Sequence, residues 1–179
     1  AEVRTDRDGR DDDRRDGEAV AHAERPRLMV DDMVAHASDS AVQRAAEAVM
    51  MQILSEQLGV VLAPATIRLN DGTRVELDGA DAERTVLVES WARLGSPKPA
   101  HHKKVLTDAL KLSWIAGHVL PRPARLVLLM ADQAAAHPFT GGSGWGAHAI
   151  ADLGVEVVVV ELPPKLSAAI IAAQARQFR

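Results

Sequence analysis

Apolar and polar residues alternate along the first half of the chain in a pattern that predicts one helix followed by strands. Apolar residues recur at helical spacing from about Ser40 to Leu58, and Gly59 suits the left-handed position that ends a helix. Three strands are expected next, at residues 66–69, 74–78 and 85–91. Asn70-Asp71-Gly72 has hairpin-turn chemistry, so the strands should form an antiparallel meander.

The second half of the chain predicts helices that alternate with buried strands. A helix is expected from about Lys98 or Ala100 to Ala116, and the continuous apolar run Arg125–Ala131 is typical of a strand buried on both faces. After a glycine-rich loop at residues 140–144, the pattern predicts a short helix that ends near 154, a strand at 155–162 and a helix at 166–177. The predicted order is α-β-β-β-α-β-α-β-α, an α/β fold with a mixed sheet.

The domain organisation follows from composition. Residues 1–32 are rich in charge and poor in apolar side chains, so we expect a disordered tail followed by a single domain at 33–179. The chain has no cysteine, which excludes disulfides, thiolate zinc sites and cysteine nucleophiles. No run has the length of a membrane helix, and the first residues lack the apolar core of a secretory signal. A soluble, cytoplasmic protein with no membrane partner is expected.

The net charge of -4 is concentrated in the predicted tail. Residues 1–32 hold 11 acids and 7 bases of the 25 and 21 in the whole chain, which leaves 14 of each for the other 147 residues. The predicted domain is therefore neutral overall. The negative net charge of the whole chain does not exclude a nucleic-acid partner.

Two acids lie late in the second and third predicted strands, at Asp78 and Glu89. Glu89 shares a strand face with Leu87 and Trp91. A carboxylate on an apolar strand is costly to bury unless it is paired or bound to a cation, so Glu89 is the strongest functional candidate.

The following helix carries a polar row beside its apolar stripe. Lys104, Asp108 and Lys111 are spaced i, i+4 and i+7 and therefore project from one side of the helix. They either reach the strand carboxylates or only pair with each other on a solvated face. His101 and His102 lie near the start of the same helix. They are either phosphate contacts or residues exposed to solvent.

The helix, the meander with its two acids, the second helix and the buried strand together resemble the core of the PD-(D/E)XK nuclease superfamily, the restriction-endonuclease-like fold. The resemblance covers roughly residues 40–162 and implies that Asp78, Glu89 and the backbone carbonyl of Ser90 bind Mg²⁺ or Mn²⁺. It also implies DNA as the substrate and a homodimer as the working form.

One position departs from the family pattern. Trp91 occupies the place of the strand lysine, so Lys104 is the expected replacement, with Lys103 and Lys111 as alternatives. Lys103, Lys111 and His102 are the expected nucleic-acid contacts. The resemblance also makes Glu47 and Asp108 accessory acids, although Glu47 suits a solvated position equally well. If no lysine reaches the acids, the chain is instead a non-catalytic binding or assembly module of the same fold.

Overall fold

The structure is a computed structural model that describes residues 25–141 and 144–177. Within these residues the chain forms helices and strands in the order α-β-β-β-α-β-α-α-β-α, which makes an α/β fold. The helices are α1 (Arg25–Leu58), α2 (Pro99–His118), α3 (Gln133–Thr140), α4 (Trp145–Asp152) and α5 (Pro164–Arg176). The strands are β1 (Ala63–Arg68), β2 (Arg74–Ala80), β3 (Val86–Trp91), β4 (Arg125–Met130) and β5 (Val155–Val159).

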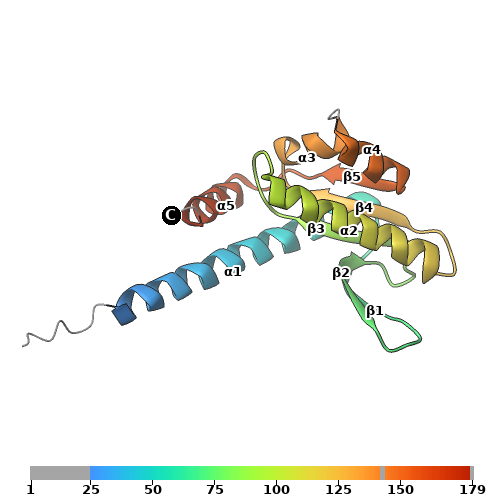
Figure 1. The fold of residues 1–179 in the computed structure, drawn as a ribbon, viewed down its shortest axis with the longest axis horizontal. Helices are drawn as coiled ribbons and strands as arrows, with labels where there is room; N and C mark the ends of the chain where they lie inside the picture. The colour runs from blue at the N-terminus through green and yellow to red at the C-terminus, as the bar shows by residue number, and fades with distance from the viewer. Residues whose placement is uncertain (1–24, 142–143, 178–179) are drawn as a thin grey trace, which may run out of the picture.

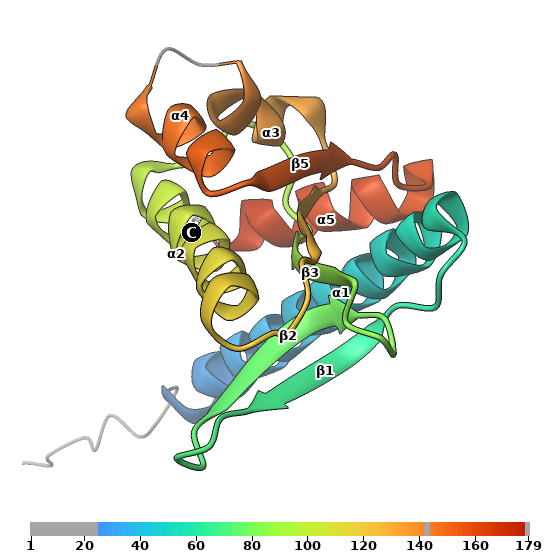
Figure 2. The same ribbon diagram turned by 90° about the vertical axis from the view of Figure 1, so that its right-hand side faces the viewer.

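The five strands form one mixed sheet in the order β1-β2-β3-β4-β5. Strands β1, β2 and β3 are an antiparallel meander, whereas β3, β4 and β5 run parallel. Helices α1 and α5 lie side by side against one face, and α2, α3 and α4 cover the other (Figures 1 and 2). The sheet is thus the middle of three layers, and β3 lies at its centre.

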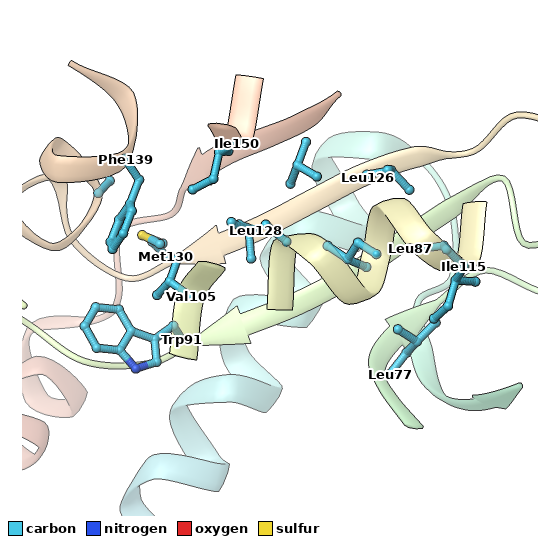
Figure 3. Close-up of a cluster of buried hydrophobic side chains, with 14 of the residues drawn as sticks. Leu77, Leu87, Trp91, Val105, Ile115, Leu126, Leu128, Met130, Phe139 and Ile150 are labelled. Atoms are coloured by element: carbon cyan, nitrogen blue, oxygen red, sulfur yellow. The ribbon is translucent and has the colours of Figure 1, made fainter. Parts of the chain in front are cut away.

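Strand β4 shows why the sheet needs helices on both faces. Its residues alternate between two buried clusters, with Leu128 and Met130 toward α2 and Val127 and Leu129 toward α1. A strand buried on both faces reads as a continuous apolar run, which is the pattern that predicted it. Figure 3 shows the cluster on the α2 side, to which Trp91 of β3 also belongs.

Helix α1 differs from its prediction at its first residue. It begins at Arg25 rather than near Ser40 and therefore includes the last residues of the predicted tail. Apolar periodicity was the signal for its start, but backbone hydrogen bonding can continue through residues that have no such periodicity. Residues 1–24 of the predicted tail lie outside the described residues.

Helix α3 was absent from the predicted order. Asp132 caps it by accepting a hydrogen bond from the backbone N–H of Ala134 at 2.7 Å. The alanine-rich start favours a helix, and Pro138 removes only one donor from an element of eight residues. The other predicted elements are present, with ends that differ by at most three residues.

In the part of the chain that the structure describes, no helix has both the length and the apolarity needed to cross a lipid bilayer.

Candidate functional site

Glu89 is buried in the centre of the sheet. Every residue of β3 is buried, and Glu89 itself is only 3% exposed. It alternates with Ser90, so its side chain lies on the same face as Leu87 and Trp91, toward α2. An ionised carboxylate in such a place needs a partner, because burial of an unpaired charge is strongly unfavourable.

Lys111 of α2 is that partner. Its Nζ lies 2.5 Å from Glu89 Oε1 and donates a hydrogen bond of 3.0 Å to the backbone carbonyl of Glu76 on β2. Glu89 Oε1 nevertheless has no hydrogen bond of good angle within the described chain, so the contact with Lys111 is a charge pair at short range. The sequence pointed to Lys104 for this position, but the structure brings Lys111 to Glu89.

The surroundings of Glu89 raise its pKa to about 7. Burial is the largest cause, and the charges of Asp78 and Asp108 raise the pKa further, while the ammonium of Lys111 opposes them. Close to neutral pH, the protonated and the ionised forms of this carboxyl group are therefore both populated.

Asp78 lies where β2 separates from β3. The paired residues of these strands are Gly79 with Val88 and Ala80 with Leu87, and the register between β1 and β2 shifts opposite the same place. The Asp78 carboxylate accepts hydrogen bonds from Ser90, at 2.7 Å from the backbone N–H and 3.0 Å from Oγ. It therefore occupies the gap between the strands, where it takes the place of a backbone acceptor.

Asp78 and Ser90 also line a groove of about 830 Å³ between α1 and the β1–β2 hairpin. We call it the acidic groove, because its lining includes four carboxylates and one arginine: Glu47, Glu56, Glu76, Asp78 and Arg44. Burial and the charge of Asp78 raise the pKa of Glu47, whereas its hydrogen bond from Gln43 and the charges of Lys104 and Arg44 lower it. Glu47, predicted as an accessory acid, thus belongs to the surroundings of Asp78.

Lys104 pairs with Asp108 one turn further along α2. Its Nζ donates to Asp108 Oδ2 at 2.6 Å, and its side chain is 54% exposed. Burial alone lowers the pKa of Lys104, but the contact with Asp108 and the charges of Glu89 and Asp78 raise it overall. The solvated-face alternative therefore describes the pairing and the exposure of Lys104, but Asp108 is buried, and the charges of both strand carboxylates still act on the lysine.

The remaining predicted residues lie around the N-terminal turns of α2. Trp91 is buried in the core, with its ring centroid 5.4 Å from that of His101. His102 is half-buried and packs on Phe139, at 5.1 Å between ring centroids. Lys103 is exposed. Of the three expected nucleic-acid contacts, Lys103 has the most open side chain, and Lys111 faces Glu89.

The donor set has a limited fit to a hard divalent cation. Among the described residues, no group of three His, Cys, Asp or Glu side chains lies close enough to hold a metal. Two carboxylates on neighbouring strands and a backbone carbonyl are a sufficient protein contribution for magnesium, which keeps several waters. Glu89 Oε1 is buried and already lies 2.5 Å from the ammonium of Lys111, so a metal ion at this oxygen would share or displace that contact. Asp78 lies close enough to Glu89 for its charge to act on it, so these two carboxylates and the Ser90 carbonyl are the donors that this part of the chain offers to such an ion.

Sequence reasoning named Lys111 as an alternative to Lys104, and the structure places it beside Glu89. Lys104 and Lys111 project from one side of the helix, and only the way α2 crosses the sheet decides which one reaches β3. The carbonyl of Glu76, which holds Lys111 in place, carries no signal in the sequence because every residue has one.

Comparisons of the chain with protein-family models, with curated proteins and with solved structures found no match.

Proposed function

We propose that this chain is a metal-dependent nuclease of the PD-(D/E)XK type that hydrolyses phosphodiester bonds, with DNA as its substrate. The observation that carries the proposal is Glu89, a buried carboxylate on the central strand with a pKa near 7 and two lysines within electrostatic reach. The observed order of helix, meander, helix and parallel strand supports the resemblance on which the family proposal rests.

Each group of side chains has its own role in the proposed reaction. Asp78 and Glu89, with the carbonyl of Ser90, hold the cation at the gap between β2 and β3. When bound, Mg²⁺ or Mn²⁺ polarises the scissile phosphate and lowers the pKa of a coordinated water. Lys111 keeps Glu89 in place and favours its ionised form.

Lys104 is the residue with freedom to meet the substrate. Its ammonium is more exposed than that of Lys111, and the raised pKa keeps it charged at neutral pH. A positioned cation near the scissile phosphate stabilises the negative charge that grows in the transition state. We assign Lys104 this role and Lys111 the role of positioning Glu89.

The test is cleavage of plasmid and branched DNA in the presence of Mg²⁺ or Mn²⁺. Glu89→Gln should lower the rate by roughly 100-fold or more, because it removes a charge that the proposed reaction requires. Glu83→Gln is the matched control, since Glu83 is exposed in the loop before β3, and it should cleave as the wild type does. Equal cleavage by all three proteins would contradict the proposal.

A non-catalytic module is the second candidate, and Trp91 favours it. Its indole fills the core at the position of the family's strand lysine. In that case DNA binding persists while the wild type and Glu89→Gln both fail to cleave.

A further inference from the structure

A small pocket lies just beyond the end of β3, beside Trp91. We call it the basic pocket, because Arg93, Lys98 and His101 line it together with Trp91 and Gln174, and none of its lining residues is a carboxylate. Its volume is about 60 Å³, far below that of a pocket for a nucleoside or drug-sized ligand. It has room for a single small group.

The basic side chains come from three neighbouring parts of the chain that other contacts hold in place. Gln174 of α5 fixes Leu94 by donating to its carbonyl at 3.0 Å and accepting from its N–H at 2.9 Å. Arg93 donates to Gln177 at 3.1 Å, and the backbone N–H of Lys98 donates to His101 Nδ1 at 3.1 Å. The pocket is therefore organised before any ligand enters.

The charges in the basic pocket repel one another. Burial lowers the pKa of His101, and the positive charges of Arg93, Lys98 and His102 lower it further. An anion placed among these groups would reverse that effect, because a negative charge favours the protonated imidazole. Guanidinium and ammonium groups bind phosphate oxygens, and the imidazole of His101 adds a donor at Nε2, because its Nδ1 already accepts from Lys98.

The position of the basic pocket relates it to the candidate site. Trp91 separates the two, since it contacts His101 and follows Glu89 by two positions on β3. An extended strand advances about 3.3 Å per residue, so Arg93 lies about 13 Å along the chain from Glu89. Along one strand of a B-DNA duplex, where phosphates follow at about 3.4 Å along the axis, this distance corresponds to about four phosphates.

We propose that Arg93, Lys98 and His101 bind one backbone phosphate of the nucleic-acid substrate and so position the strand for cleavage at Glu89. The inference deepens the proposed nuclease function and rests on it. It names the pocket as a contact for the sugar-phosphate backbone, which implies affinity without sequence preference.

The first experiment measures binding without cleavage. Fluorescence anisotropy with a labelled 20-base-pair duplex in EDTA compares the wild type with Arg93→Gln/Lys98→Gln. The double variant should bind about tenfold more weakly, with a shallower dependence on salt, because each phosphate contact releases counterions. Arg84→Gln/Arg122→Gln removes the same charge from exposed positions near the other end of β3 and should bind within about twofold of the wild type.

Two outcomes of this experiment overturn the pocket: no binding by the wild type, or equal weakening in both double variants. Thermal unfolding of each variant confirms that it folds. Binding that depends on the pocket, with no cleavage by any protein, would support the pocket and contradict the nuclease. Cleavage by the wild type, together with unchanged DNA binding by Arg93→Gln/Lys98→Gln, would support the nuclease and contradict the pocket.

A second readout separates phosphate contact from a structural role. In an NMR titration of the imidazole protons, the pKa of His101 should rise when the unlabelled duplex is bound. The imidazole protons of His148, which is exposed on α4, are the control and should keep the same chemical shifts when DNA is added. An unchanged His101 in the saturated complex would overturn its assignment to the phosphate.

Discussion

The acidic groove and the basic pocket lie at successive positions of one strand and have opposite charge. Ser90 lines the groove beside Asp78, whereas Trp91 and Arg93 line the pocket beside His101. Burial, followed by the charge of Asp78, raises the pKa of Glu47 in the groove, whereas burial, followed by the charges of Arg93, Lys98 and His102, lowers the pKa of His101 in the pocket. A phosphodiester hydrolase needs both kinds of site: anionic groups for the metal and cationic groups for the phosphates. The net charge of the chain conceals this separation, and the local charges show it.

The largest expected effect concerns stability against pH. Glu89 has its pKa raised from 4.5 to about 7 in the folded protein, so between these values the folded state keeps a proton that the unfolded state loses. Stability should therefore fall as pH rises through this window, by about 3 kcal/mol, and level off above it. Urea unfolding at pH 5, 6, 7 and 8 measures the change.

Glu89→Gln should flatten this dependence. The smaller dependence that remains combines two opposite contributions: the raised pKa of Glu47 makes stability fall as pH rises above 4.5, whereas the lowered pKa of His101 makes it rise as pH increases through the region just below 6.5. If the stability of the wild type and that of Glu89→Gln depend on pH in the same way, Glu89 does not cause the pH dependence.

The next prediction compares the loss of stability when one cation is removed beside Glu89 and one from the basic pocket. Lys111→Met leaves the Glu89 carboxylate buried beside no ammonium and should cost about 2 kcal/mol at pH 8, with some discount because Lys111 is partly exposed. Arg93→Gln should cost less than about 1 kcal/mol, because its charge has no carboxylate neighbour in the pocket lining. Urea unfolding at pH 8 compares them, and equal losses would remove the distinction drawn between the two sites.

The smallest effect is that of metal removal. Free Mn²⁺ at about five times its Kd should stabilise the wild type by about 1 kcal/mol, and EDTA should abolish the gain. Because the cation competes with a proton for Glu89, the gain should be larger at pH 8 than at pH 6. Thermal unfolding of Glu89→Gln should show no gain, whereas Arg93→Gln/Lys98→Gln should keep it. The same gain in both variants would indicate weak surface binding.

Most of the fold could be predicted from the sequence because strands and helices leave periodic patterns. Strand β4 is a continuous apolar run because it is buried on both faces. Strand β2 alternates between apolar and polar residues because it is buried on one face. Helix α3 could not be predicted with the same rules, since its Pro138 reads as a loop signal and its cap, Asp132, is a single residue. The start of α1 lacks an apolar stripe to mark it.

The candidate site could be predicted in part. Glu89 stood out because a charged residue interrupts an apolar strand, and the structure buries it as that argument requires. The choice between Lys104 and Lys111 depends on how the helix crosses the sheet, and the bond from Ser90 to Asp78 depends on where two strands separate. Such relations between elements leave no local pattern in the sequence. The nuclease activity, the DNA substrate, the dimer and the cytoplasmic location stay predictions.

Lys111 has a consequence for how the hairpin and the central strand move. One ammonium holds both the Glu89 carboxylate of β3 and the Glu76 carbonyl of β2, so it ties the β1–β2 hairpin to the charge on Glu89. By thermodynamic reciprocity, a ligand that draws the hairpin away changes the proton affinity of Glu89, and a change of charge on Glu89 alters how tightly the hairpin is held. The position of the hairpin and the ionisation of the carboxylate are in this way two linked equilibria.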